Sequence, residues 1–334
     1  MRAGFRPLRL VGTALAVATL LTLVLPAGVQ ADQARPAAAA LGGSSTTRLT
    51  GPAGARLTAR SAAESGGSAP GTLSGPFVAL GDSYAAGDLV PSSPSGTPAG
   101  CLRSSHNYSA DAAATLGMTR YVDAACTGAT TADLTRPQSV LLGTNPPQLS
   151  FLGPDDSVVT LTIGGDDIGF LGILETCARL GLTDLFGAPC QRHYTAGGTD
   201  QLVAAINAAA PKVAAALQQI RARAPRARVL LVGYPDILPG TGDGCWPLVP
   251  FAFGDVPYLN RIELDVNQML ATTAQANGVT FVDTYTATIG GDACQPASVK
   301  DVEGLIPTLP AYPFHPNQRG QQVMADQVPA ALAG

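Results

Sequence analysis

The stretch Phe77-Val-Ala-Leu-Gly-Asp-Ser-Tyr84 decides how this chain folds and where its chemistry is expected. Its first four residues are an unbroken apolar run, which is typical of a short strand buried on both faces of a parallel sheet. Gly81-Asp-Ser-Tyr84 follows at once and is polar and led by glycine. Because ligands in open α/β sheets bind beyond the carboxyl ends of the strands, this exit is a candidate functional site.

Further apolar runs predict the rest of a sheet, with helices between its strands. The strands are expected at Tyr121–Ala124, Ser157–Ile163, Arg228–Val232 and Val279–Val282, and the helices at Asp200–Ala224, Tyr258–Ala276 and Asn317–Leu332. We expect the first of these helices to be broken or kinked at Pro211, because proline has no backbone N–H to donate. This alternation predicts one doubly wound α/β domain over residues 76–334.

The first 75 residues are expected to lie outside that domain. Three arginines within the first nine residues precede an uncharged apolar run, Leu10–Leu25, and Val29–Ala31 offers small side chains for cleavage. Residues 1–31 are therefore interpreted as a secretory signal peptide. The alternative is a membrane anchor, but the run is shorter than the roughly 20 residues that a span needs. Residues 32–75 have the composition of a linker or pro-segment.

The charge of the predicted domain argues against a nucleic-acid partner. The chain of 334 residues has a formal net charge of −4, with 46% hydrophobic and 13% charged residues. Residues 1–75 hold seven of the 20 basic side chains and two of the 24 acidic ones, which leaves 13 basic and 22 acidic side chains in the domain. Nucleic-acid binding needs a basic surface, so this class of partner is excluded.

Six cysteines follow the signal peptide: Cys101, Cys126, Cys177, Cys190, Cys245 and Cys294. An even number in an exported chain predicts disulfides. We favour sequential pairing, 101–126, 177–190 and 245–294, because each bond then closes a local loop. The alternative is a zinc site, but the chain has no Cys-x-x-Cys or His-Glu-x-x-His motif. No metal and no cofactor are expected.

Ser83 and His315 are the candidate nucleophile and base. Ser83 lies just past a buried strand, where a tight turn exposes its hydroxyl and a following helix directs free N–H groups to the same place. The alternative for Ser83 is an ordinary helix N-cap. Of the three histidines, His106 and His193 are expected in loops or caps. His315 directly precedes the last predicted helix, whose first position Pro316 would fill.

Four motifs in order resemble one family. They are Gly81–Tyr84, Gly128 within Cys126–Thr130, Gly164-Gly-Asp-Asp167, and His315-Pro-Asn317 with Gly320. The set resembles the SGNH (GDSL) hydrolase superfamily, and most of all its secreted, disulfide-bonded bacterial lipases and esterases. The resemblance covers residues 76–334 and implies a three-layer α/β/α sandwich of the flavodoxin-like kind, with a mostly parallel five-stranded sheet.

The resemblance also implies roles for single residues. Ser83 would attack the ester and donate its backbone N–H to the oxyanion, and Gly128 would donate a second N–H. His315 would act as general base and then as general acid, so that hydrolysis proceeds through an acyl-enzyme.

Two positions depart from the family pattern. Where the family has an asparagine that donates to the oxyanion, this chain has Asp166, which can donate only when protonated. An impaired or acid-shifted enzyme is therefore expected. Where the family often has an aspartate that orients the histidine, this chain has Tyr312. We expect a Ser–His dyad whose imidazole donates to the carbonyl of Tyr312 or Pro313; Asp283 and Asp301 are the other candidates.

The sequence thus predicts a secreted, extracellular serine esterase or lipase, monomeric and without a stable membrane span, that acts on carboxylic esters of lipids or small acyl groups. The alternative is a binding protein on a weakened hydrolase scaffold, which Asp166 and Tyr312 suggest. The presence of Ser83, Gly128 and His315 together favours the enzyme. The apolar loop Cys245–Phe253 either lines an acyl pocket or touches a lipid surface, or it packs onto the domain as a covered loop.

Overall fold

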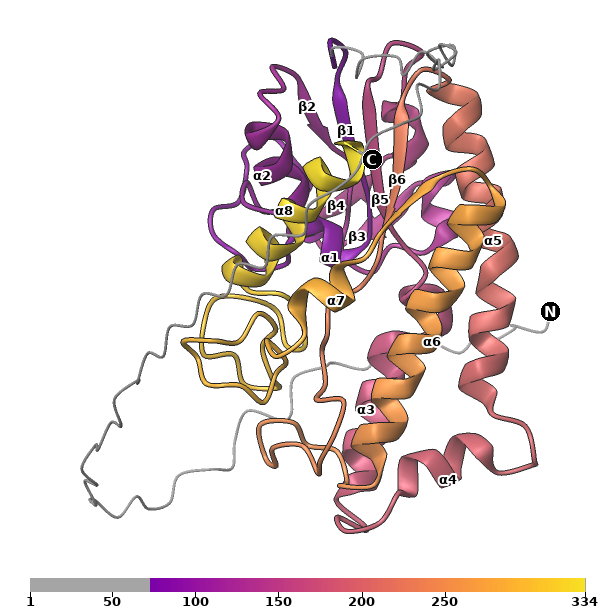
Figure 1. Cartoon of the computed structure of the whole chain (residues 1–334), viewed down its shortest axis with the longest axis vertical. Coiled ribbons are helices and arrows are strands. Elements are labelled where there is room, and N and C mark those ends of the chain that lie inside the picture. Colours follow the sequence, from indigo (N-terminus) through magenta and orange to yellow (C-terminus); the bar gives the residue numbers. More distant parts are fainter. Residues whose placement is uncertain (1–72, 334) are drawn as a thin grey trace, which may run out of the picture. The chain divides into compact units, whose positions relative to one another are not determined.

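The structure is a computed structural model that describes residues 73–333 (Figure 1). The predicted signal peptide and most of the predicted linker lie outside these residues. The strands are β1 (Phe77–Gly81), β2 (Tyr121–Asp123), β3 (Gln138–Val140), β4 (Gly143–Asn145), β5 (Val158–Thr162), β6 (Arg228–Val232) and β7 (Thr280–Val282). Five of them form one parallel sheet in the order β2-β1-β5-β6-β7, and they are the five strands predicted from the sequence.

The helices cover both faces of this sheet. The α-helices are α1 (Ser83–Ala86), α2 (Tyr108–Thr115), α3 (Phe170–Gly181), α4 (Pro189–Thr195), α5 (Gln201–Arg223), α6 (Asp255–Ala276), α7 (Thr284–Thr288) and α8 (Gln318–Ala333). Four short 3-10 helices are η1 (Ala99–Cys101), η2 (Thr131–Leu134), η3 (Gln148–Phe151) and η4 (Asp166–Ile168).

Alternation along the strands produces two cores and hence three layers. Val78 and Leu80 of β1 pack in a core with buried side chains of α3, α5 and α6. Phe77 of β1 and Val158 of β5 face the other way and pack with α2 and α8. Successive side chains of a strand point to opposite faces, so a strand covered on both sides is apolar throughout. The predicted three-layer α/β/α sandwich is confirmed (Figure 1).

The predicted break at Pro211 is wrong. Helix α5 runs through Pro211 without interruption, from its N-cap Asp200, whose carboxylate accepts two backbone N–H groups, to Arg223. Proline removes one hydrogen bond from the middle of the helix. Buried side chains on both sides of it, Ile206 and Val213 among them, hold the two halves against the same core.

The start of the last helix also differs from the prediction. Helix α8 begins at Gln318, and Pro316 lies outside it, in an isolated bridge with Val302. The Asn317 side chain accepts the backbone N–H groups of Arg319 and Gly320 and so caps the helix. An asparagine that caps the first turn moves the helix start beyond itself.

Several elements were not predicted: the strands β3 and β4 and the helices α3, α4 and α7, of which α4 contains His193, a residue expected in a loop or cap. Strands β3 and β4 form an antiparallel hairpin, and each has only three residues, too few to show an alternating pattern.

Three disulfides join Cys101 to Cys126, Cys177 to Cys190 and Cys245 to Cys294, which is the sequential pairing favoured from the sequence. Within residues 73–333, no helix has both the length and the apolar character needed to cross a bilayer.

Candidate active site

The candidate nucleophile lies at the junction of β1 and α1. Asp82 is the N-cap of α1, and its carboxylate accepts the Tyr84 N–H at 3.0 Å. Ser83 is the first helical residue and is 8% exposed. Gly81 has φ +139°, and a Cβ there would lie 2.3 Å from the Thr162 carbonyl oxygen, so only glycine fits this turn. The turn presents the Ser83 side chain at the carboxyl edge of the sheet.

The structure brings Ser83 and His315 into direct contact. The distance from His315 Nε2 to Ser83 Oγ is 2.7 Å, and the distance from His315 Nδ1 to the Pro313 carbonyl oxygen is 2.8 Å. A carbonyl only accepts, so Nδ1 carries the proton and Nε2 is free to accept from the serine hydroxyl. Burial lowers the pKa of His315 to about 4, which keeps the ring neutral at neutral pH.

Aromatic contacts hold the imidazole in place. The Tyr84 ring stacks on His315 with centroids 4.5 Å apart, and its hydroxyl donates to the Phe314 carbonyl at 2.7 Å. The Tyr312 ring lies edge-on to the imidazole of His315, with the ring centroids 5.2 Å apart. Tyr312 therefore contacts the histidine through its ring. The main-chain carbonyl of Pro313 accepts the Nδ1 hydrogen bond that a carboxylate would otherwise accept.

The two other aspartates considered for this task have structural partners instead. Asp283 caps α7 through Thr286, and Asp301 pairs with the Arg319 guanidinium at 3.0 Å. The remaining histidines lie apart from this pair: His106 faces Asp111 near the start of α2, and His193 belongs to α4.

The loop that contains Gly128 is attached directly to the end of β1. The Cys126 N–H donates to the Gly81 carbonyl at 3.0 Å, and Cys126 is also joined to Cys101. Gly128 has φ +70°, a conformation that favours glycine. Within residues 73–333, the backbone N–H groups of Ser83 and Gly128 donate to no other protein group, so both are available to a ligand.

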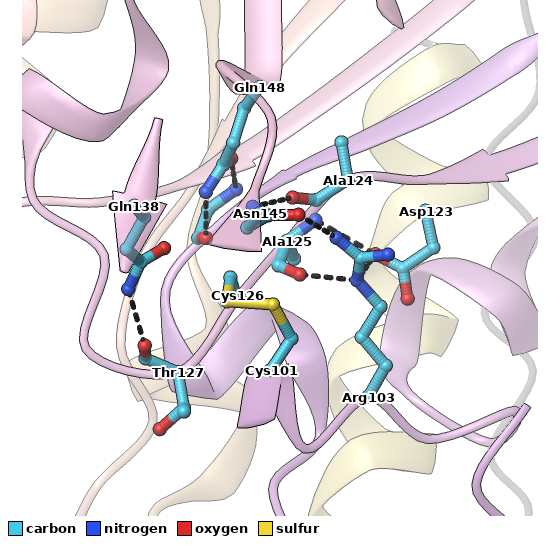
Figure 2. Close-up of a disulfide and its surroundings, with 11 residues drawn as sticks. Cys101, Arg103, Asp123, Ala124, Ala125, Cys126, Thr127, Gln138, Asn145 and Gln148 are labelled. Carbon is cyan, nitrogen blue, oxygen red and sulfur yellow. Dashed lines mark hydrogen bonds and ion pairs between the residues drawn. A yellow bond between two sulfur atoms is a disulfide. The ribbon is translucent and has the colours of Figure 1, made fainter. Parts of the chain in front are cut away.

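Two amide side chains, one buried and one partly buried, which sequence reasoning missed, support this loop and the turn it is attached to (Figure 2). The Gln148 amide binds Gly81 on both sides, accepting its N–H at 2.7 Å and donating to its carbonyl at 2.8 Å. Gln138 donates to the Thr127 carbonyl at 2.8 Å. Nothing in the local sequence marks either glutamine, because their partners are backbone groups 67 and 11 residues away in the chain.

Asp166 begins η4 and lines the same pocket as Ser83. Burial, followed by the nearby charges of Asp167 and Asp133, raises the pKa of Asp166 to about 6. The Asp167 carboxylate accepts both the N–H and the hydroxyl of Thr131, at 2.8 and 2.6 Å, and so connects this loop to the Gly128 loop. Because its pKa is about 6, Asp166 is largely protonated in mild acid and largely ionised at neutral pH.

A tyrosine that the sequence did not single out links the two polar strand exits. The Tyr234 hydroxyl, which follows β6, donates to Asp82 at 2.5 Å and accepts the Gly165 N–H at 2.8 Å. Burial raises the pKa of Asp82 well above its ordinary value, and the charge of Asp166 adds to this effect. The only sequence signal is the position of Tyr234 just beyond a strand.

An apolar pocket opens beside Ser83. It is lined by Ile168, Phe170, Ile173 and Leu174 from η4 and α3, by Ile237 and Leu238 after β6, and by Leu259, Ile262, Glu263 and Val266 of α6. The loop Cys245–Phe253 is not among these residues; Phe251 is buried and stacks on Phe314 instead. The loop therefore does not line the apolar pocket: Val249–Ala252 is buried against the domain, and Pro247 and Leu248 are exposed.

A second groove, lined by more polar side chains, shares Asp166 with the apolar pocket. It is lined by threonines of the Gly128 loop and of η2, by Asp167, and by Lys212 and Gln219 of α5. Asp166 borders both hollows. Across residues 73–333, no three His, Cys, Asp or Glu side chains come together in a way that would hold a metal ion.

Comparisons with known proteins agree with this architecture. The model of the GDSL-like lipase/acylhydrolase family matches residues 79–323. Lipase 2 of Streptomyces coelicolor is 39% identical over 254 residues, which cover 75% of this chain and 83% of that protein. An esterase of Streptomyces scabiei is 30% identical over 334 residues, covering 87% of this chain and 92% of the esterase.

A solved structure is similar as well. The crystal structure of phospholipase A1 from Streptomyces albidoflavus superposes with a TM-score of 0.61 at 25% identity, covering 77% of this chain and 99% of that one. The fold and these matches define an ester hydrolase built on an α/β/α sandwich. The chain belongs to the GDSL-like lipase/acylhydrolase family, and it is a carboxylic-ester hydrolase.

Proposed function

We propose that this protein is a secreted serine esterase or lipase that works through a Ser–His dyad. The observation that carries the proposal is the hydrogen-bonded chain from Ser83 Oγ through both His315 nitrogens to the Pro313 carbonyl. Ser83 Oγ attacks the ester carbonyl carbon while Nε2 takes its proton. His315 then returns that proton to the leaving alcohol, and the acyl group remains on Ser83.

Deacylation repeats the same steps with water. His315 Nε2 takes a proton from water, the hydroxide oxygen attacks the acyl carbon, and the proton returns to Ser83 as the acid leaves. In both halves the Pro313 carbonyl accepts the Nδ1 proton and stabilises the imidazolium; this hydrogen bond opposes the lowering of the His315 pKa by burial.

The oxyanion is proposed to lie between the backbone N–H groups of Ser83 and Gly128 and the carboxyl of Asp166. Its charge develops only during the reaction, so donors held in advance stabilise the transition state more than the substrate. Protonated Asp166 donates a third hydrogen bond. Ionised Asp166 donates none and repels the oxyanion. The enzyme is therefore proposed to work best in mild acid.

The two hollows that share Asp166 suggest how the ester lies. The apolar pocket beside Ser83 suits an acyl chain, and the polar groove with Lys212 suits the alcohol portion. The names of the relatives, lipase, esterase and phospholipase A1, support lipid esters as the substrate class.

The signal-peptide pattern and the three disulfides support secretion to the cell exterior. We further propose that the enzyme acts as a monomer and binds no nucleic acid.

The test is hydrolysis of p-nitrophenyl esters of increasing chain length at mildly acidic and neutral pH. Ser83→Ala is expected to lose at least about a thousand-fold of kcat, since the nucleophile is gone. Ser150→Ala, which removes an exposed hydroxyl of η3, is the matched control and should retain full activity. Equal activity of wild type and Ser83→Ala would overturn the mechanism, and the binding-protein alternative would follow if neither hydrolysed any ester.

A further inference from the structure

Among the apolar side chains that α6 contributes to the pocket beside Ser83 is one carboxyl group, that of Glu263. Glu263 lies on α6 on the same face as Leu259 and Val266, and all three line the pocket beside Ser83. A carboxyl group in apolar surroundings costs free energy unless each of its oxygens has a partner. The carboxyl of Glu263 therefore needs a hydrogen-bond partner for each oxygen, and the protein supplies one for only one of them.

The two oxygens of this carboxyl are in different situations. Oε1 accepts the backbone N–H of Ile237 at 2.9 Å. Oε2 is buried, and within residues 73–333 it has no hydrogen-bond partner; the Leu238 N–H approaches the carboxyl but forms no hydrogen bond of normal geometry. One half of Glu263 therefore holds the segment after β6 against α6, and the other half is unused.

The surroundings of Glu263 favour its neutral form. Burial raises the pKa of Glu263 well above its ordinary value, and the nearby carboxyls of Asp236 and Asp292 raise it further. Within residues 73–333, no lysine or arginine forms an ion pair with Glu263. A neutral carboxyl can both donate and accept a hydrogen bond, so it suits an uncharged oxygen of a ligand rather than a cation.

Glu263 also lies within reach of the reacting end of the pocket. Ser83, Tyr84 and Glu263 line the same pocket, and the Tyr84 ring stacks on His315. The pocket is continuous from Ser83 to Glu263. An acyl chain attached to Ser83 that fills this pocket would therefore meet Glu263.

We propose that Glu263 selects esters whose acyl chain carries a hydroxyl group part-way along it, through a hydrogen bond between that hydroxyl and Oε2. The inference rests on the proposed function and names a substrate class for the same site. A pocket that provides a hydrogen-bonding group discriminates against the analogue without one, because its own polar group is then left unpaired.

The proposal is tested by competition between methyl octanoate and the methyl esters of hydroxyoctanoic acid isomers, with the product ratio measured by mass spectrometry. The ratio equals the ratio of kcat/KM values. One isomer is expected to be preferred by about ten-fold, which corresponds to one buried hydrogen bond. Glu263→Gln keeps an acceptor for Ile237 and a donor for the ligand, so it should retain most of this preference.

Glu263→Leu should lose the preference, whatever happens to the overall rate. Asp265→Leu is the matched control: it makes the same kind of change on the same helix but at a half-exposed side chain paired with Arg261, and it should keep the preference. If Glu263 serves only to hold Ile237, Glu263→Leu will change the rates of all esters equally and leave their ratio untouched. That result would overturn the proposal.

Binding to the Ser83→Ala variant separates this inference from the proposed function. Calorimetry with the same methyl esters is expected to show tighter binding of the preferred isomer by about ten-fold, without any turnover. Unchanged ester hydrolysis by Ser83→Ala, with the preference for one isomer intact, would contradict the mechanism alone. Equal binding and equal turnover of all the esters by otherwise active enzyme would contradict the role of Glu263 alone.

Discussion

Asp166 illustrates how one side chain sets the working conditions of the whole site. An oxyanion needs donors, and a carboxyl group donates only while it keeps its proton. Burial and two neighbouring aspartates raise the pKa of Asp166 to about 6, while burial lowers that of His315 to about 4. The window in which Asp166 is protonated and His315 is neutral therefore lies between these values.

We predict a bell-shaped dependence of kcat/KM on pH. Activity should rise through about pH 4 as His315 loses its proton, and fall above about pH 6 as Asp166 ionises. Asp166→Asn should remove the fall and raise kcat/KM at pH 7.5 by about ten-fold or more, since losing one oxyanion donor costs roughly 10²–10³. Steady-state kinetics from pH 3.5 to 9 check this, with Asp265→Asn as the control. A folded Asp166→Asn variant with lower neutral activity would contradict it.

A second prediction concerns Tyr234. Tyr234→Phe removes the hydroxyl that donates to Asp82 and accepts from Gly165, and both of these groups are buried. The free energy of unfolding should fall by about 1–3 kcal/mol, because two buried polar groups lose a partner. Urea unfolding measures this loss. Tyr194→Phe is the control, since the Tyr194 hydroxyl has no hydrogen-bond partner within residues 73–333, and an equal loss in both variants would refute the prediction.

At the scale of elements, the Gly128 loop is held by contacts from several separate segments. Cys101 of η1 binds it covalently, Gln138 of β3 holds the Thr127 carbonyl, and Gln148 of η3 fixes the glycine that precedes the nucleophile turn (Figure 2). The hairpin and the two 3-10 helices therefore serve the site, although none of them belongs to the main sheet.

Removing the first disulfide should affect both stability and catalysis. In the double variant Cys101→Ser and Cys126→Ser, the free energy of unfolding should fall by about 2–4 kcal/mol, and kcat should also fall because the Gly128 N–H is less well held. The double variant Cys177→Ser and Cys190→Ser is the control. It opens a loop of 13 residues rather than 25, between α3 and α4, and should lose stability without the same loss of kcat. Equal losses of kcat in the two double variants would show that the first bond has no special role in the site.

At the scale of the whole molecule, buried carboxyl groups connect stability to pH. Burial raises the pKa of Asp123 to about 7 and those of Asp166 and Asp236 to about 6. A carboxyl with a raised pKa binds its proton more tightly in the folded state. Its contribution is complete below the unfolded pKa of about 4 and is lost as the pH rises through the folded value. His315, with a lowered pKa, acts in the opposite direction but is a single group.

We therefore predict that the protein is more stable in mild acid than at neutral pH. The Tm should fall by several degrees between pH 5 and pH 8, because the three carboxyls release their protons over this range. Differential scanning calorimetry of the oxidised chain measures the change. Asp123→Asn should flatten the upper part of the curve, and a Tm that rises steadily from pH 5 to pH 8 would show that these groups do not control stability.

Much of the fold follows from local patterns of residues. The central strands β1 and β5 are short runs buried along their whole length, and burial on both faces is the physical reason for their mostly apolar composition, whereas the edge strands β2 and β7 are only partly buried. The order of the motifs around Ser83, Gly128 and His315 is equally visible along the chain. The continuity of α5 through Pro211 was not predicted, because packing on both sides of the proline outweighs its local cost.

What local patterns cannot specify are contacts between residues far apart in the chain. The sequence left open which group orients His315, and the choice of the Pro313 carbonyl follows from how that loop closes over Tyr84. The sequence predicted a helix over Tyr258–Ala276, but not that this helix faces a pocket or that Glu263 lines it. Short-range propensity and burial determine where the strands, helices and motifs lie along the chain. The contacts of His315 and Glu263 form only when the sheet and its covering helices pack together, because they join residues far apart in the chain.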